Sequence, residues 1–192
     1  MDLANKYEIW AQIFLSIEDS KRIREFFVNE IGIKQYFVYS QMHLTFYHSQ
    51  VLIPEIHSTE KDIYLILPAS ETRFMVLIAG GENPIPGVDP GMNKVGIRIQ
   101  HRSSVLEEIF EMRTELTRFE TPEIIGDRSP SSRKKSAFGA RHFQPHMSLL
   151  KPGSGIGSDL TIVGKLFREK MGDLVFDKYK IDIVKVVDWN DL

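Results

Sequence analysis

The sequence contains no cysteine, no apolar run long enough to cross a bilayer and no excess of positive charge. The lack of cysteine excludes disulfides, thiolate zinc sites and a cysteine nucleophile, and it fits a reducing cytoplasm. The longest apolar run, around Phe74–Ala79, is too short for a membrane span. The N-terminus shows no basic segment followed by an apolar one, as a secretory signal would. We therefore expect a cytoplasmic protein with no membrane partner.

The net charge of −2 over 192 residues limits the kind of ligand that we expect. A protein that wraps long duplexes is usually basic, because it must neutralise many phosphates. Apolar residues make up 42% of the chain and charged residues 26%, as in ordinary globular proteins with a buried core. The chain therefore suits a small or short phosphorylated ligand, and its length allows one domain or two small lobes around a shared groove.

Segments of strand-like and helix-like pattern are mixed along the chain. Aromatic, β-branched and alternating residues predict extended segments over 8–17, 36–47, 63–67, 74–79, 94–100, 142–150 and 180–187. Apolar residues spaced three and four apart predict helices over about 18–30, 103–119 and 159–171. The Ser103-Ser104 pair with Glu107 resembles a capping box at the start of the second helix. The short turns favour an α+β fold with antiparallel sheets over a doubly wound parallel sheet.

Two histidine motifs with the same pattern stand about a hundred residues apart, in strand-like contexts. They are His43-Leu44-Thr45-Phe46 and His146-Met147-Ser148-Leu149. Because side chains alternate between the two faces of a strand, each histidine shares a face with the hydroxyl residue two positions on. The apolar residues between them point the other way, into a core. Each strand is thus expected to be buried on one side and to present an imidazole beside a hydroxyl on the other.

An imidazole beside a hydroxyl suits phosphoryl chemistry. A neutral imidazole can accept a proton from an attacking hydroxyl or water, and a protonated one can donate a proton to the leaving oxygen. The hydroxyls of Thr45 and Ser148 can hydrogen-bond non-bridging phosphate oxygens and fix the phosphorus between the rings. One motif alone is more often a half-buried strand histidine with a nearby hydroxyl, but two such motifs favour a shared catalytic site. No carboxylate or further histidine stands beside them at metal-ligand spacing, so we expect no metal and no cofactor.

The pair of motifs resembles the 2H phosphoesterase superfamily, which includes bacterial 2′-5′ RNA ligase-like proteins and 2′,3′-cyclic nucleotide phosphodiesterases. Phe143-Gln144-Pro145 before His146 is similar to the residues that often precede the second histidine of that family. The order of strands and helices also fits. The resemblance implies a bilobal, pseudo-twofold fold in which antiparallel sheets line a central groove and helices lie outside. It also implies that His43, Thr45, His146 and Ser148 are the catalytic residues.

A basic stretch leads into the second motif. Residues 128–141 contain Arg128, Arg133, Lys134, Lys135 and Arg141 without an acidic residue. We interpret 121–141 either as a mobile basic loop that closes over a phosphorylated ligand or as a solvated charged loop. Lys135 and Arg141 are the candidate phosphate-binding residues, and Tyr47, Phe138 and Phe143 are candidates for stacking on a base, with core packing as the alternative. The other four histidines lack the motif and are expected to be surface or structural residues: His48, His57, His101 and His142.

The sequence thus predicts a metal-independent phosphodiesterase that acts as a monomer on a small nucleotide or a short RNA. The resemblance suggests 2′,3′-cyclic phosphates as the first substrate. The alternatives are 2′-5′-linked or cyclic oligonucleotide signals, as degraded by a phage-type anti-defence enzyme. A non-catalytic nucleotide- or RNA-binding module on the same fold, or a plain α+β interaction domain, would be functions of a different kind.

Overall fold

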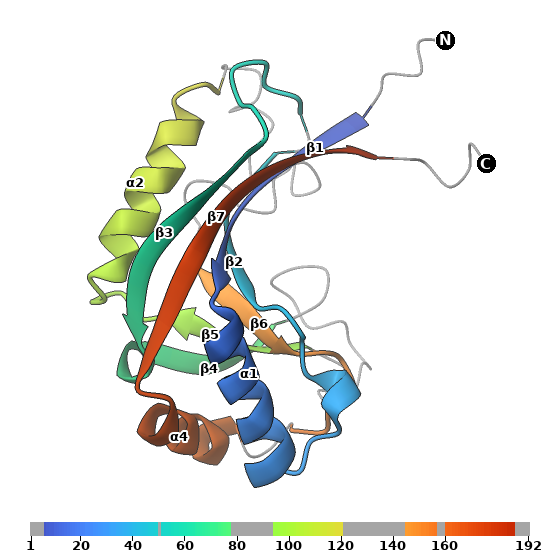
Figure 1. Cartoon of the computed structure of the whole chain (residues 1–192), viewed down its shortest axis with the longest axis vertical. Helices are drawn as coiled ribbons and strands as arrows, with labels where there is room; N and C mark the ends of the chain where they lie inside the picture. Colours follow the sequence, from blue (N-terminus) through green and yellow to red (C-terminus); the bar gives the residue numbers. More distant parts are fainter. Residues whose placement is uncertain (1–5, 50, 78–93, 121–144, 157–159, 187–192) are drawn as a thin grey trace, which may run out of the picture.

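The computed structural model describes residues 6–49, 51–77, 94–120, 145–156 and 160–186. Seven strands form one antiparallel sheet in the order β3-β7-β1-β2-β6-β5-β4 (Figure 1). The strands are β1 (Lys6–Leu15), β2 (His43–Ser49), β3 (Thr59–Pro68), β4 (Thr72–Leu77), β5 (Lys94–Ile99), β6 (His146–Leu150) and β7 (Asp173–Val186). The helices are α1 (Ile17–Glu25), α2 (Val105–Thr117) and α4 (Leu160–Met171), with short helical turns η1 (Phe26–Glu30), η2 (Gln35–Phe37) and η3 (Ala69–Glu71).

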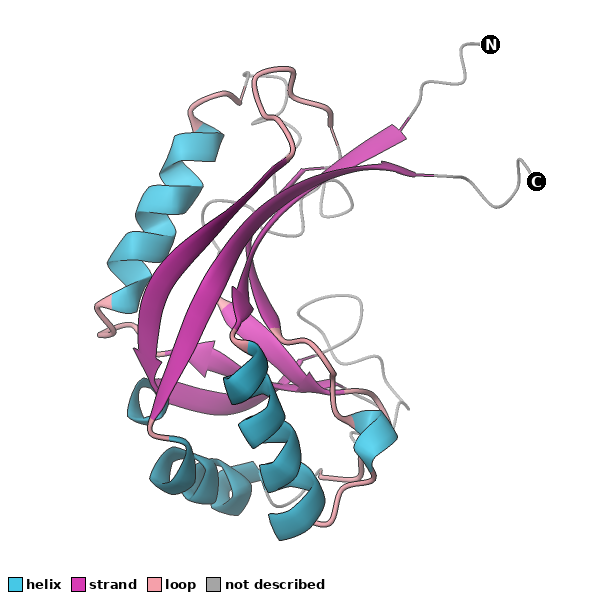
Figure 2. Cartoon of the chain, viewed as in Figure 1, coloured by secondary structure: helices cyan, strands magenta, loops and turns pink. Residues whose placement is uncertain are grey.

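The sheet is strongly curved, and α1, α2 and α4 lie on its convex side (Figure 2). The core fills the space between this side and the helices. On β1, for example, Ile9, Ala11 and Ile13 are fully buried, while the alternating residues face the other way. The rings of Phe27, Phe74 and Phe167 meet between η1, β4 and α4. The concave side of the sheet therefore carries the polar half of each strand.

The prediction of an α+β fold with antiparallel strands is confirmed. The strands form one continuous open sheet, and two separate lobes are not seen in the described residues. Each of the ten predicted helices and strands overlaps an observed element. The extended segment predicted over 36–47 is wrong in its first half, because β2 begins only at His43 and Gln35–Phe37 form the helical turn η2. β7 starts at Asp173 and is much longer than the predicted segment over 180–187. The predicted capping box is not formed by Ser104, whose side chain makes no capping hydrogen bond. The predicted basic loop over 121–141 lies outside the described residues.

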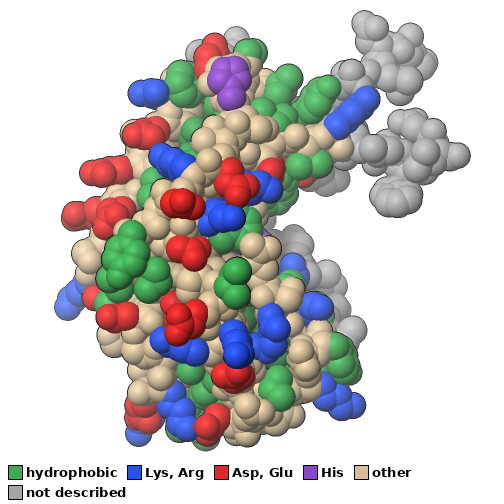
Figure 3. All heavy atoms as spheres, in the orientation of Figure 1, with side chains coloured by type: hydrophobic (Ala, Val, Ile, Leu, Met, Phe, Trp, Pro, Cys, Tyr) green, Lys and Arg blue, Asp and Glu red, His purple; other side chains and the backbone are tan. Residues whose placement is uncertain are grey.

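Charges of both signs are interspersed over the surface seen in Figure 3. This agrees with the small net charge, and it means that a local surplus of one sign stands out against the rest of the surface. None of the helices within the described ranges is long and apolar enough to span a bilayer.

Candidate active site

The two histidine motifs lie on neighbouring strands in the middle of the sheet. β2 and β6 are antiparallel, with Leu44 opposite Met147. The same register sets His43 opposite Ser148 and Thr45 opposite His146, because antiparallel partners run in opposite directions. Residues directly opposite have Cβ atoms about 4.5–5.5 Å apart, and the two histidines, on the diagonal, are separated by roughly 7–8 Å. His43, Thr45, His146 and Ser148 thus form one compact cluster, which we call the quartet.

The quartet lies on the face of the sheet that the helices leave uncovered. Leu44 and Met147 are 1% exposed and pack into the core. The four quartet residues are half-buried, so their polar groups remain within reach of a ligand. Burial alternates over the four residues of each motif, as predicted. The four residues are therefore brought together on a single face, while their catalytic role stays a prediction.

A β-bulge lies at the last residue of the motif on both strands. On β2, Ala11 pairs with Tyr47 and Gln12 with Thr45, which leaves Phe46 as an extra residue. On β6, Val95 pairs with Leu150 and Gly96 with Ser148, which leaves Leu149 as the extra one. Each extra residue stands three positions after its histidine. The irregularity thus falls at the same place in both motifs.

The bulge on β2 is stabilised from the helix side. A bulge leaves backbone groups out of the regular hydrogen-bond ladder. Arg113 of α2, which is only 5% exposed, donates a hydrogen bond from Nη1 to the Phe46 carbonyl oxygen at 2.8 Å. Such a contact both satisfies the carbonyl and provides a partner for the buried guanidinium. Arg113 therefore stabilises the bulge at Phe46, beyond which the side chains of β2 point to opposite faces from those expected without the bulge.

Of the two roles considered for Tyr47, stacking on a base and packing in the core, the structure shows core packing. The bulge shifts Tyr47 to the helix-covered face, opposite Ala11, and its side chain is fully buried. The guanidinium carbon of Arg113 lies 5.9 Å from the centre of its ring. Tyr47 is therefore a core residue in this structure and is not positioned to stack on a base. The other predicted substrate-binding residues, Lys135, Phe138, Arg141 and Phe143, lie outside the described residues.

Gln12 of β1 positions the Thr45 hydroxyl. Its side-chain nitrogen Nε2 donates to Thr45 Oγ1 at 3.2 Å. Because the hydroxyl oxygen already accepts this hydrogen bond, its own proton is free to point toward a ligand oxygen. Sequence patterns identify Gln12 as a residue on the polar face of a strand. They do not reveal that this strand pairs with the first motif.

The environment of His43 favours its neutral form. Burial, then the positive charge of Lys94 and then that of His146 lower the pKa of His43 below its ordinary value. The Phe14 ring, whose centre lies 5.5 Å from that of the His43 ring, contributes to the apolar surroundings. A neutral imidazole at neutral pH can accept a proton. The surroundings of His43 therefore favour the form of its imidazole that can accept a proton.

His48 forms a second histidine site on the same face of β2. It lies opposite Trp10, and the two rings are stacked with centres 3.8 Å apart. Trp10 Nε1 donates to Glu8 Oε2 at 3.0 Å, and the same oxygen is 3.8 Å from His48 Nε2. Burial lowers the pKa of His48, although Glu8 acts in the opposite direction. This arrangement agrees with the structural role predicted for His48.

Two comparisons with known proteins give no relative. No protein-family model matches the chain, and no curated protein sequence matches it significantly. Within the described ranges, no group of three or more histidine or carboxylate residues is arranged to hold a metal ion. The functional argument therefore depends on the geometry of the quartet and its surroundings.

Proposed function

We propose that the protein is a metal-independent phosphodiesterase of the 2H type, which cleaves a phosphodiester in RNA or a nucleotide. The observation that carries this proposal is the pairing of β2 with β6, with each histidine opposite the hydroxyl residue of the other motif. A phosphate placed over the quartet would meet an imidazole on two opposite sides and a hydroxyl on the other two. This arrangement suits in-line displacement at phosphorus.

The proposed roles follow from the surroundings of each residue. His43, with its lowered pKa, removes a proton from the attacking water or ribose hydroxyl as the new P–O bond forms. His146, on the diagonal, donates a proton to the leaving oxygen as the old P–O bond breaks. Thr45 and Ser148 donate hydrogen bonds to the non-bridging oxygens, whose negative charge must be stabilised during the reaction. The proton balance returns to its starting state when the two histidines exchange protons with solvent.

A pseudo-twofold relation between two halves of the molecule belongs to the same proposal. It is supported by the sheet order, in which β7-β1-β2 on one side matches β4-β5-β6 on the other. The bulges at the last residue of both motifs support it as well. The first substrate to test is a 2′,3′-cyclic phosphate, followed by 2′-5′-linked and cyclic oligonucleotides.

The test is an assay of the purified chain with these three substrate classes, with products identified by mass. We expect turnover of at least one class, unchanged by EDTA. His146→Ala should reduce the rate by about 10²–10⁴-fold, the usual contribution of a general acid. Thr45→Val and Ser148→Ala should reduce it less, because each removes a single hydrogen bond to the phosphate.

Three results would count against the proposal. Full activity of His146→Ala would exclude the two-histidine mechanism. Inhibition by EDTA that a divalent ion reverses would indicate metal chemistry instead. Binding of nucleotides without turnover of any phosphodiester would favour a non-catalytic binding module on this fold.

A further inference from the structure

The two histidines have different neighbours on the outer strands, β1 and β5. Phe14 of β1 lies opposite His43, and Arg98 of β5 lies opposite His146. One strand further out, Arg73 of β4 lies opposite Arg98. Directly opposite residues of a sheet share a face. The flank of the quartet beside His43 is therefore aromatic, and the flank beside His146 carries two successive arginines.

The positive charges on the two flanks are also balanced differently. On the Phe14 side, Lys178 of β7 forms an ion pair with Glu60 of β3, with Nζ 2.9 Å from Oε1. Within the described chain, neither Arg73 nor Arg98 forms an ion pair with a carboxylate. Like charges directly opposite one another destabilise a sheet. An anion bound between the two guanidinium groups would relieve this repulsion.

The arginines border a hollow large enough for such an anion. It has a volume of about 530 Å³ and is lined by Arg73, Arg98, Ile99, Gln100, His101 and Arg102. Three of these six residues are arginines and none is acidic, in a chain whose net charge is negative. Arg98 Nη2 lies 2.8 Å from His101 Nε2, so the imidazole nitrogen accepts a hydrogen bond and holds the guanidinium in place. Volumes of a few hundred Å³ are typical of ligand sites.

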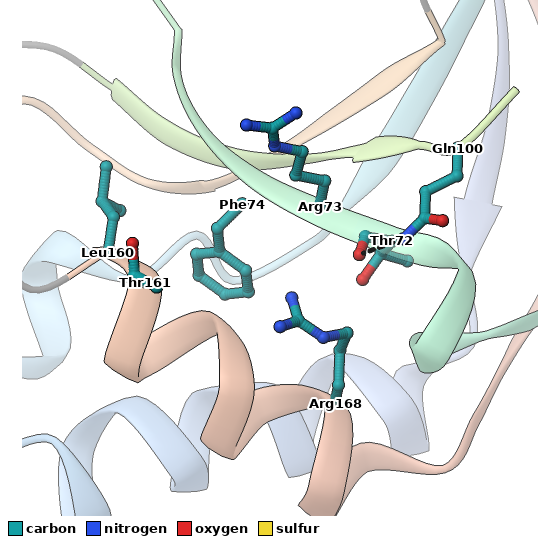
Figure 4. Close-up of a pocket in the computed structure, with 7 residues that line it drawn as sticks. All are labelled: Thr72, Arg73, Phe74, Gln100, Leu160, Thr161 and Arg168. Carbon is teal, nitrogen blue, oxygen red and sulfur yellow. Dashed lines mark hydrogen bonds between the residues drawn. The ribbon is translucent and has the colours of Figure 1, made fainter.

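The side chain of Arg73 projects away from the core. Figure 4 shows Arg73 and Phe74 leaving β4 on opposite sides, at a second hollow of about 400 Å³ between β4 and α4. Phe74 packs against Phe167 of α4, with ring centres 5.0 Å apart. Arg73 must then lie on the side where Arg98 and His146 lie, as the strand pairing requires. The two arginines and His146 thus follow one another across three strands of the same face.

We propose that Arg98 and Arg73 form an accessory phosphate subsite, which binds a second phosphate of the same substrate molecule. The inference rests on the proposed function, since it takes the reacting phosphodiester to lie over the quartet. β5 and β4 lie about 5 and about 10 Å from β6, which brings both guanidinium groups within reach of a phosphate one nucleotide away. Arginine binds phosphate through paired hydrogen bonds in a fixed geometry. The preferred substrate is therefore an oligonucleotide or a phosphorylated nucleotide, and a mononucleoside cyclic phosphate leaves the subsite empty.

The subsite is tested with matched dinucleotides in both 3′-5′ and 2′-5′ linkage. ApA carries one phosphodiester and no other phosphate, while pApA and ApAp add a terminal phosphate at one end or the other. Binding is measured by calorimetry at several salt concentrations with the full-length chain and with its His43→Ala variant, in which turnover does not interfere. We expect one of the two phosphorylated forms to bind roughly tenfold more tightly than ApA.

Arg73→Gln and Arg98→Gln should each remove most of this gain. Each should also lower the slope of log affinity against log salt by about 0.7, the change expected for one lost phosphate contact on a single strand. The matched control is Arg118→Gln, which removes the same charge from an exposed position at the end of α2, on the other face of the sheet. This variant should keep the full gain.

The outcomes separate the subsite from the proposed function. Equal affinity for ApA and both phosphorylated forms overturns the subsite. A gain in affinity that persists in the Arg73→Gln/Arg98→Gln double variant overturns it as well, and so does the failure of every dinucleotide to bind. The comparison of ligands on the unmutated chain decides the question even if an arginine variant fails to fold. Arginine-dependent binding without turnover in the wild-type chain supports the subsite and contradicts the phosphodiesterase. Turnover without a preference for the second phosphate supports the phosphodiesterase and contradicts the subsite.

Discussion

The two ends of β2 carry a histidine each, His43 and His48, and both face the concave side of the sheet with a lowered pKa. His43 is half-buried and lies beside Thr45 and a second histidine. His48 is 5% exposed and is stacked against Trp10, with Glu8 beside it. The same residue type on the same strand thus has two different environments. Only the first leaves an imidazole accessible beside groups that could hold a phosphate.

The difference shows that a lowered pKa does not by itself identify a catalytic residue. In both cases burial is the largest cause of the shift. For His43 the further causes are positive charges, which also attract a phosphate. For His48 the other influence is the Glu8 carboxylate, which raises the pKa against the effect of burial and would repel a phosphate. The partners of each histidine therefore decide between a role in chemistry and a role in stability.

The largest expected effect is on turnover. His43→Gln should lower kcat by about 10³-fold, because general-base catalysis typically contributes 10²–10⁴-fold. His48→Gln should change kcat by less than about threefold, since general-base catalysis requires contact with the reacting proton. The measurement is kcat on whichever phosphodiester the chain turns over, with circular dichroism as the control for folding. A larger loss of kcat in His48→Gln than in His43→Gln would contradict the catalytic role proposed for His43 and the structural role of His48.

Part of this comparison could be predicted from the sequence. The alternation around His43 and His146 predicts that each shares a face with a hydroxyl, and the burial of Leu44 and Met147 confirms the alternation. The bulge at Phe46 could not be predicted, because it depends on the register with β1 and on Arg113 from a distant helix. Because of that single extra residue, Tyr47 points into the core and His48 points to the concave face.

The residues that surround the quartet could not be predicted from the sequence either. Gln12 and Arg98 have the pattern of ordinary polar residues on amphipathic strands. Their importance comes from strand order, which places β1 beside β2 and β5 beside β6. Strand pairing between segments far apart in sequence depends on tertiary packing and has no local signal. The sequence therefore predicts which residues of each motif share a face, but it does not predict which residues of other strands lie beside them.

The next effect in size is on stability. Here the replacement of His48 should have the larger effect and that of His43 the smaller one. His48→Ala should lower the free energy of unfolding by about 2 kcal/mol, because it removes a buried ring stacked on Trp10 and leaves a cavity. For a chain of this length that corresponds to a fall in Tm of roughly 4–8 °C. His43→Ala, at a half-buried position, should cost less than about 1 kcal/mol. Thermal unfolding of the two variants side by side measures the difference, and equal losses would contradict the structural role of His48.

The smallest effect concerns the pH dependence of stability. Both histidines have a lower pKa in the folded chain than in the unfolded one, where the value is close to 6.5. Between these values the unfolded state binds more protons, so the folded state loses stability as the pH falls below about 6.5. The slope cannot exceed about 1.4 kcal/mol per pH unit for each histidine. Chemical denaturation between pH 7.5 and 5 should show this decline, before most carboxylates begin to titrate.

Replacing the two histidines one at a time divides that decline between the two ends of β2. His48→Gln and His43→Gln should each flatten the profile below pH 6.5, because glutamine does not titrate and retains a polar side chain of similar length. At high salt, the difference in slope between the unmutated chain and His48→Gln should persist, and the difference for His43→Gln should become smaller. Burial acts on His48 regardless of salt, whereas part of the shift at His43 comes from the charges of Lys94 and His146, which salt screens. A pH profile that neither substitution changes would show that neither histidine is held in its neutral form by the fold.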